Sequence, residues 1–547
     1  MKVTLLPVSL LALAAFAVPA QLSAQCPANP LGALSGPWTF NVQGLSIPIF
    51  RGTNNNSFAI AGQFRASIGV DRAGNPIGVL TINATSSING STTRSENDIG
   101  RFQINSTCTG GTLIMNLSSY PMQYDFSFYD SGRSIYIVST LEGRAATGSA
   151  TGGVAGCPAG NPLTLFSGNY ALKLQHIAVA GGPFNATHGM AGRLVAFTDG
   201  GATPRGLLAI TATSNFTEQH SVTRLERDAG SYQINDDCSG GTLIFNLSSR
   251  PLQYQFYFRA GFRELDVISI SGVAIYGVIS RADTVACPAN TLSLLNGPWT
   301  FNVQTIVKDR ADANWAAVGR FRASVGADRL GNPTGVLNIN ATSLNTTGFD
   351  GFPSPTRLEN DFGSFQINED CTGGTLIMNL SSFPMQYDFW FYNNNQSIYF
   401  VSTSPGRGAT GSATIGVSGC PVGLPSPSPL SILSGTYGFK FQRIPNFTVE
   451  PFGIAGLLTA STGVDRGGNP AGLLAITATS SIGLGGSIAR LEGDVGRYQI
   501  NDDCSGGTLI FNLSSRPAQY EFYFRAGFQS FDVISQVCPS AFGEVSR

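Results

Sequence analysis

One arginine and two acidic residues alternate along a short segment that recurs four times in the chain. In the first copy they are Arg94, Glu96 and Asp98, and Tyr124 follows in an aromatic run. Residues two apart in a β-strand share a face, so the three charges line up. A tyrosine hydroxyl beside them would form a small polar pocket able to bind a ligand or transfer protons. The candidate ligand-binding residues are therefore Arg94, Glu96, Tyr124, Arg224, Glu226, Tyr254, Arg357, Glu359, Tyr387, Arg490, Glu492 and Tyr520.

The direction of these charges depends on Gly100. The same parity continues through Gly100 to Phe102 and Ile104, which alternate as core residues do. Either the strand is continuous and the charges enter one end of the domain, where buried ionisable groups need partners, or a bulge at Gly100 turns them outward. We expect the outward arrangement, a surface ladder of ion pairs, and assign no catalytic residue.

Other constellations that could hold a metal are weaker. The loop 71–76 contains Asp and Asn among glycines, but a calcium site needs six or more oxygen ligands and this loop lacks their usual rhythm. We expect a turn there. The three histidines, His176, His188 and His220, all lie in the second copy, so no histidine-based site can be repeated. We predict no metal and no cofactor.

Four related segments must position these residues. The hairpin sequence GRFQINSTCTGGTLIMNLSS begins at Gly100 and returns with small changes from Gly230, Gly363 and Gly496. Odd copies resemble each other most, as do even copies, which indicates duplication of a two-domain unit. A period near 130 residues is too long for a solenoid, so each copy should have its own core. We name the domains A1 (26–156), B1 (157–286), A2 (287–419) and B2 (420–547).

Domain A1 reads as a series of short strands separated by turn signals. The strand-like segments are 38–43, 58–68, 78–84, 92–98, 101–105, 112–117, 122–129 and 134–140. A strand near 145–152 completes the set if the fourth and fifth segments form one interrupted strand. This pattern predicts an all-β fold in which each domain is an eight-stranded antiparallel up-and-down (calycin-like) barrel. A two-sheet β-sandwich is the alternative.

Nine cysteines are placed regularly, and two per repeat in an exported chain indicate disulfides. Pairing each opening cysteine with the turn cysteine of its own repeat, as in Cys26–Cys108, leaves Cys538 unpaired. Pairing each turn cysteine with the next opening cysteine leaves Cys26 unpaired instead. We favour the first scheme, because the repeats align Cys538 with Gly272 rather than with an opening cysteine.

The N-terminal sequence predicts export. Residues 1–24 have Lys2, an apolar run and a small-residue cleavage signal, as a signal peptide does. No later segment is apolar enough for a membrane-spanning helix, so the mature chain should be secreted, periplasmic or at the cell surface. Charged residues make up 12% of the chain and the net charge is −1, which excludes a basic surface for nucleic acid.

Three repeated motifs carry a resemblance. The opening cysteine with Gly-x-Trp/Tyr-x-Phe, the Asp-x-x-Gly-Asn loop and the hairpin Gly-x-Tyr/Phe-x-Ile-Asn-x-x-Cys-Thr/Ser-Gly resemble uncharacterised bacterial secreted tandem β-domain repeat proteins. The resemblance covers nearly all of each copy and implies export and repeated β-domains, but no chemistry. In strand count and size only, the domains are distantly similar to the barrels of allene oxide cyclase and dirigent proteins.

The main functional hypothesis is an exported, non-enzymatic multidomain β-protein for surface interaction or structure. With four similar domains, several weak contacts with a surface or matrix component would combine into strong binding. One alternative is a carrier with one small apolar ligand per barrel. A less favoured alternative is a cyclase- or isomerase-like enzyme that uses Tyr124, Arg94 and Glu96.

Overall fold

The computed structural model describes residues 26–547 apart from a set of short stretches. These stretches are 47–55, 89–91, 119–120, 142–143, 177–186, 202, 218–220, 248–250, 271–274, 284–285, 306–314, 346–356, 383, 405–407, 422–428, 444–451, 466, 483–487, 514–516 and 537–540. The predicted signal peptide and Cys538 lie outside the described residues. Within them, no helix is long and apolar enough to cross a membrane.

Domain A1 is a closed antiparallel barrel of eight strands, as predicted. Its strands are β1 (Gly36–Ser46), β2 (Asn56–Val70), β3 (Pro76–Ile88), β4 (Thr92–Ile104), β5 (Gly110–Met115), β6 (Met122–Tyr129), β7 (Ser134–Ser139) and β8 (Arg144–Gly152). The fourth and fifth predicted segments form the single strand β4, and β8 is the closing strand.

The other three domains are closed eight-stranded barrels too. Barrel B1 contains β9 (Gly168–His176), β10 (Thr187–Thr198), β11 (Gly206–Thr217), β12 (Ser221–Ile234), β13 (Gly240–Asn246), β14 (Pro251–Phe258), β15 (Glu264–Ser269) and β16 (Ile275–Arg281). Barrel A2 contains β17 (Gly297–Thr305), β18 (Trp315–Ala327), β19 (Pro333–Asn345), β20 (Arg357–Ile367), β21 (Gly373–Met378), β22 (Met385–Tyr392), β23 (Ser397–Ser402) and β24 (Ala409–Ile415). Barrel B2 contains β25 (Gly435–Arg443), β26 (Phe452–Val464), β27 (Pro470–Ile482), β28 (Ile488–Ile500), β29 (Gly506–Asn512), β30 (Pro517–Phe524), β31 (Ser530–Ser535) and β32 (Ala541–Ser546).

Short 3₁₀ helices connect or cap these strands. They are η1 (Pro30–Leu34), η2 (Asp130–Gly132), η3 (Pro162–Phe166), η4 (Ala260–Phe262), η5 (Thr291–Leu295), η6 (Pro429–Leu433) and η7 (Ala526–Phe528). In A1 the helix η1 buries Leu34 completely, and the Trp38 indole N–H donates to the Leu34 carbonyl at 2.8 Å. The 3₁₀ helix before the first strand thus adds an apolar side chain to the barrel core.

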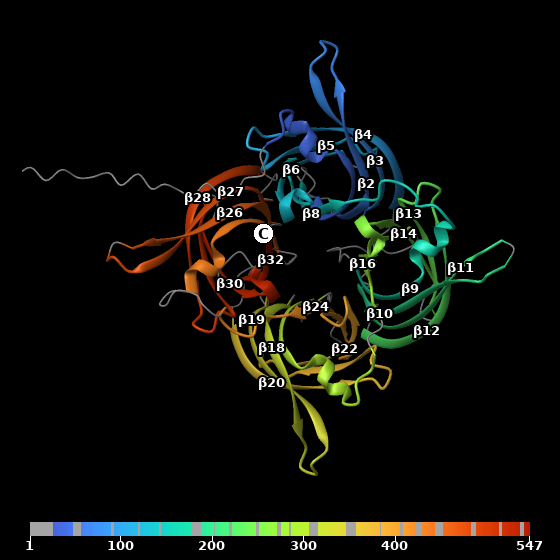
Figure 1. Cartoon of the computed structure of the whole chain (residues 1–547), viewed down its shortest axis with the longest axis vertical. Helices are drawn as coiled ribbons and strands as arrows, with labels where there is room; N and C mark the ends of the chain where they lie inside the picture. Colours follow the sequence, from blue (N-terminus) through green and yellow to red (C-terminus); the bar gives the residue numbers. More distant parts are fainter. Residues whose placement is uncertain are drawn as a thin grey trace, which may run out of the picture.

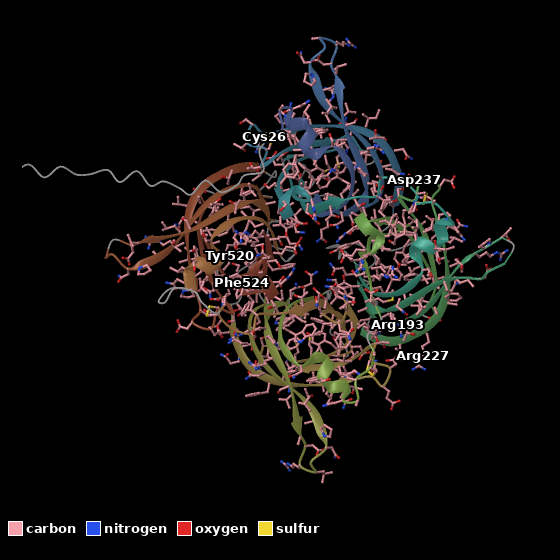
Figure 2. The ribbon with its side chains drawn as sticks, viewed as in Figure 1. Cys26, Arg193, Arg227, Asp237, Tyr520 and Phe524 are labelled. Carbon is pink, nitrogen blue, oxygen red and sulfur yellow. A yellow bond between two sulfur atoms is a disulfide. The ribbon has the colours of Figure 1, made fainter. Side chains whose placement is uncertain are left out.

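Inward-facing aromatic and aliphatic side chains fill each barrel (Figure 2). In A1, Trp38 stacks on Phe64 with ring centroids 6.2 Å apart, and Phe126 lies against the same cluster. Alternation along the strands directs these side chains inward and most polar ones outward. A barrel of eight strands is narrow enough for side chains to occupy its interior.

A disulfide ties the start of each domain to the turn after its fourth strand. The pairs are Cys26–Cys108, Cys157–Cys238, Cys287–Cys371 and Cys420–Cys504. Pairing within each repeat is therefore confirmed. Each bridge closes a loop of more than 80 residues, such as the separation of 82 for the first pair. By restricting the unfolded chain, a bridge of this length stabilises its domain by about 4 kcal/mol.

The four barrels form a closed ring (Figure 1). In each interface the second strand of one barrel packs on the sixth and seventh strands of the next, with small side chains on the second strand. At the A1–B1 interface Ala59 and Ala61 contact Tyr257 and Ile268. Equivalent clusters join B1 to A2 and A2 to B2. A fourth cluster joins B2 back to A1, so the first and last barrels are neighbours.

Candidate functional site

The strand β4 runs through Gly100 without a bulge. Its pairing with β3 is continuous from Thr92 to Phe102, and Gly100 lies opposite Met115 of β5. A side chain at Gly100 would place its Cβ 2.3 Å from the Ile114 carbonyl oxygen, so glycine is needed where β5 approaches closely. The bulge expected at this glycine is therefore wrong, and the parity of Phe102 extends to Glu96.

Glu96, Glu226 and Glu359 point into their barrels. Glu96, Glu226 and Glu359 are each only 1% exposed. Each carboxylate accepts a hydrogen bond from a buried serine hydroxyl of the preceding strand. These bonds are Ser86–Glu96 at 2.7 Å, Ser214–Glu226 at 2.6 Å and Ser343–Glu359 at 2.6 Å. The expected surface ladder is wrong for these glutamates, because a hydroxyl partner makes the buried position tolerable.

Barrel A2 shows where a complete set of the predicted site residues lies. The Arg357 guanidinium is 57% exposed, and its Nε is 4.0 Å from a Glu359 carboxylate oxygen. Tyr387 is fully buried, and its hydroxyl donates to Met385 Sδ at 3.2 Å. Burial raises the pKa of the Tyr387 hydroxyl above its usual range. The arginine and the glutamate thus approach each other, while the tyrosine hydroxyl is engaged elsewhere.

The same residues in the other barrels are described in part. Tyr124, Tyr254 and Tyr520 are fully buried. The side chains of Arg94, Arg224, Arg490 and Glu492 lie outside the part of the chain that the structure describes in atomic detail.

A threonine that the sequence reasoning did not select links each barrel to the next one. The segment Ala-Thr-Ser recurs at 84–86, 212–214, 341–343 and 478–480. Its serine faces the lumen, and its threonine faces the neighbouring barrel. Thr85 and Thr342 share hydrogen bonds with Tyr257 and Tyr523 at 2.9 and 3.0 Å. Thr213 and Thr479 donate to Asp388 and Asp125, both at 2.6 Å. The recurrence of this tripeptide was the available signal.

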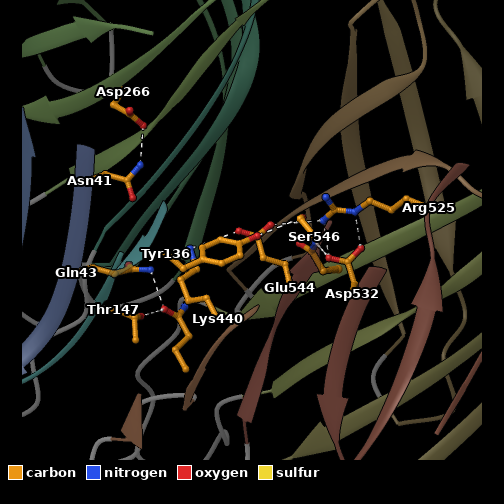
Figure 3. Close-up of polar contacts among 12 residues, drawn as sticks. Asn41, Gln43, Tyr136, Thr147, Asp266, Lys440, Arg525, Asp532, Glu544 and Ser546 are labelled. Carbon is orange, nitrogen blue, oxygen red and sulfur yellow. Dashed lines mark hydrogen bonds and ion pairs between the residues drawn. The ribbon is translucent and has the colours of Figure 1, made fainter. Parts of the chain in front are cut away.

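Charged side chains of the two B barrels meet tyrosines of the A barrels around the centre of the ring. We call this group the central hub. It comprises Tyr129, Tyr136, Lys173, Arg259, Glu264, Asp266, Tyr392, Tyr399, Lys440, Arg525, Asp532 and Glu544. Figure 3 shows part of the hub, including the ion pair between Arg525 and the buried Asp532 at 2.6 Å.

Ion pairs keep both the partly buried Arg259 and the partly buried Glu544 of the hub in their charged states. Arg259 pairs with Asp266 and with Glu264, both at 2.8 Å. Burial lowers the pKa of the Arg259 guanidinium, but the two carboxylates raise it further, so its pKa lies well above the ordinary value. Burial raises the pKa of the Glu544 carboxyl, but Lys440 and Arg525 lower it below its usual value. These paired groups favour a structural role over proton transfer.

The interfaces alternate between two kinds of contact at the hub. Where an A barrel meets the following B barrel, Asn41 donates to Asp266 at 2.8 Å, and Asn302 donates to Asp532 at 3.0 Å. Where a B barrel meets the following A barrel, a lysine lies over a tyrosine ring. Lys173 and Lys440 each lie 5.4 Å from the ring centroids of Tyr399 and Tyr136. Each surface is therefore complementary to the other kind of barrel.

The two remaining sequence motifs have ordinary structural roles. In the loop 71–76, the Asp71 carboxylate accepts hydrogen bonds from the backbone N–H of Ala73 and of Asn75, both at 2.8 Å, as a turn requires. His176 is buried at the end of β9. The side chains of His188 and His220 lie outside the described residues. Among those described, no group of three or more His, Cys, Asp or Glu is placed to hold a metal ion.

Comparisons with known proteins give only distant likenesses. No protein-family model matches the chain, and no curated protein matches it. Among solved structures, transferrin binding protein B from Neisseria meningitidis is 10% identical, with a TM-score of 0.17, 92% of this chain covered and 86% of that one. A DUF3598-family protein of unknown function from Nostoc punctiforme is 11% identical (TM-score 0.12, 57% and 96% covered). Kievitone hydratase from Nectria haematococca is 10% identical (TM-score 0.13, 70% and 90% covered). Similarity at this level carries no argument about function.

Proposed function

We propose that this protein is an exported, non-enzymatic scaffold that presents four similar surfaces to a cell-surface or matrix component. The observation that carries the proposal is the closure of the ring. Thr479 of B2 donates to Asp125 of A1 at 2.6 Å, and the Asp130 N–H donates to the Arg547 carbonyl at 2.8 Å. Because the first and last barrels are bonded to each other, the four barrels keep constant relative positions, as multivalent binding requires.

The outward surfaces that we propose for contact are the four hairpins that project from the ring (Figure 1). They are formed by β2–β3, β10–β11, β18–β19 and β26–β27. Each carries an exposed apolar side chain close to its turn. These are Val70 (70% exposed), Phe197 (43%), Leu330 (87%) and Val464 (66%). The positions of these side chains differ from hairpin to hairpin, but every hairpin exposes a large apolar group near its turn, which supports a contact role.

Export is part of this proposal. The four disulfides fit an oxidising compartment outside the cytosol. The predicted signal peptide agrees with that location.

The test is a binding series with envelope fragments of the producing cells. The variants replace the hairpin residue by Ser (V70S, F197S, L330S, V464S) in one, two or all four hairpins. Binding should weaken with each added replacement, and the four-hairpin variant should lose far more affinity than a single replacement does. Sedimentation with the fragments measures the bound fraction.

A matched control changes exposed apolar residues elsewhere on each barrel. The control replacements are I99S, L225S, F362S and V495S, at side chains that are 55–69% exposed. They should leave binding unchanged. Full binding by the four-hairpin variant would refute the contact role of the hairpins.

A second candidate function is the carrier of a small apolar ligand, with one site per barrel. The buried Ser–Glu pair inside the barrel favours it, because a polar group in an apolar lumen can orient a ligand. In this proposal Arg94, Glu96 and Tyr124, with their equivalents in the other barrels, contact the ligand. Native mass spectrometry of the full chain should show bound small molecules, and their absence at every barrel would count against a carrier.

A further inference from the structure

A polar groove of about 590 Å³ lies between barrels A1 and B1. Barrel A1 contributes outward side chains of β3 and β4, and barrel B1 contributes the disulfide turn and β14. Figure 2 labels Asp237, which lies at this junction. The lining residues are Asn83, Thr85, Asn97, Asn235, Asp236, Asp237, Gln255, Tyr257 and Ile270.

The walls of the groove are held in place by the fold. Asn83 and Asn97 are exposed cross-strand partners in the β3–β4 pair. On the opposite wall, the Cys157–Cys238 disulfide anchors the turn, and the Asp237 carboxylate accepts from the Ser239 N–H at 3.0 Å. A site on such braced elements needs little ordering when a ligand binds.

The chemistry of the lining selects a class of ligand. Asparagine and glutamine amides offer both donors and acceptors, and the aspartates Asp236 and Asp237 accept from hydroxyl groups. No lysine, arginine or histidine is among the lining residues, so an anion would meet two carboxylates without a balancing charge. The volume lies in the range of small-ligand sites. A neutral molecule with many hydroxyl groups fits these conditions.

The equivalent place between A2 and B2 is already occupied by internal contacts. There Asn340 donates to Asn360 at 2.8 Å, and Arg320 forms an ion pair with Asp503 at 2.6 Å. Gln536 donates to Glu521. These bonds use the polar groups that would otherwise face a ligand.

The groove between A1 and B1 lacks these internal contacts. Gln63 stands where A2 has Arg320, and it donates to the Ser239 carbonyl at 2.7 Å rather than to a carboxylate. Ile270 stands where B2 has Gln536. Among the described residues, Asn83 and Asn97 make no side-chain hydrogen bond to each other. Thr85 and Tyr257 are buried and bonded to each other, as Thr342 and Tyr523 are in the other groove. The side chains of Asn83, Asn97, Asp236 and Asp237 are exposed to solvent.

We propose that the A1–B1 groove binds a neutral polyhydroxylated ligand, such as the sugar units of a glycan, with one molecule per chain. The site is separate from the projecting hairpins, so it goes beyond the scaffold function and stands if the hairpins prove to bind nothing.

Saturation-transfer NMR and titration calorimetry on the full chain can test this site. The probes are maltose, cellobiose and N,N′-diacetylchitobiose, each compared with its tetrasaccharide to distinguish a free sugar from part of a longer glycan. At least one probe should bind saturably with one site per chain. N97A should weaken that binding about fivefold, the loss expected for one hydrogen bond.

Two further variants make the test specific to this groove. Q63R should abolish binding, because an arginine there can pair with Asp237 as Arg320 pairs with Asp503. Its folding is expected, since barrel A2 has arginine at the equivalent position. N360A, the matched change in the other groove, should leave binding unchanged. Equal losses in N97A and N360A, binding abolished by EDTA, or no binding of any probe would each overturn the proposal.

Discussion

Lys173 is the residue of the hub whose surroundings are least balanced. Its cross-strand partner is Val278, whereas the equivalent Lys440 lies opposite Glu544, 3.5 Å away. Burial lowers the pKa of Lys173 from 10.5 to about 8, and the partly compensating charge of Glu544 belongs to another barrel. Lys173 is therefore a partly buried lysine with no carboxylate at the cross-strand position in its own barrel.

This imbalance predicts a pH dependence. Between about pH 8 and 10.5 the unfolded chain holds a proton on this lysine that the folded chain has released, so stability rises with pH in that window. NMR of the Lys173 side chain should give a titration midpoint near pH 8. V278E should raise the midpoint, because it supplies the missing carboxylate. A K173M variant that keeps the same rise in stability would contradict this account.

At the scale of residues, the sequence predicted which charges recur but not how they point. Parity placed Glu96 on the face of Phe102, and the expected bulge was invoked because a carboxylate in a core needs a partner. That partner, Ser86, belongs to the preceding strand, ten residues earlier. Register between strands decides such contacts, and it depends on the turns and on neighbouring strands rather than on local pattern.

At the scale of elements, the strand β28 contains two glycines that differ in whether a side chain would fit. A Cβ at Gly496 would lie 2.3 Å from the Ile510 carbonyl oxygen, whereas a Cβ at Gly493 would meet nothing within 4 Å. Gly496→Ala should destabilise barrel B2 by about 1–3 kcal/mol, the usual effect of overpacking. Gly493→Ala should be neutral or slightly stabilising. Hydrogen exchange of β28 and β29 measures both, and equal effects would exclude close strand approach as the reason for Gly496.

The elements themselves were largely predictable. Alternating apolar residues and glycine-rich turns identified the strands, and cysteine spacing identified the disulfides. The prediction divided β4 into the segments 92–98 and 101–105, and left open that the two form one strand. In the barrel Ile99 faces solvent at 67% exposure, and Gly100 accommodates the adjacent strand, so neither residue ends β4.

At the scale of the whole molecule, the B2–A1 interface differs from the others because no chain segment connects its two barrels directly. Ala455 packs there against Tyr136 and Val138, as Ala191 packs at the B1–A2 interface. Ala455→Trp should open the ring and increase the radius of gyration in solution scattering, because the bulky ring separates the barrels. Ala191→Trp should have a smaller effect, since a short segment keeps its barrels close. Identical scattering curves for the two variants would contradict ring closure.

Ring closure was not predictable from the sequence. The interfaces use alanine, threonine, glutamine and tyrosine on outward strand faces, and such residues are common on exposed sheets. The alternation of A and B copies was the one feature of the sequence that relates to the ring. It corresponds to the two kinds of interface, one with the Asn41–Asp266 hydrogen bond and the other with Lys440 over the Tyr136 ring.

The alternating interfaces also bear on how the two halves of the chain can change. Two identical A–B chains would meet through the same contacts and close the ring as a symmetric homodimer. In such a dimer every substitution would appear twice. Joined in one chain, the halves can differ, and they do: Gln63 corresponds to Arg320, and Val278 corresponds to Glu544. Covalent fusion thus permits one half to specialise while the other preserves the original contacts.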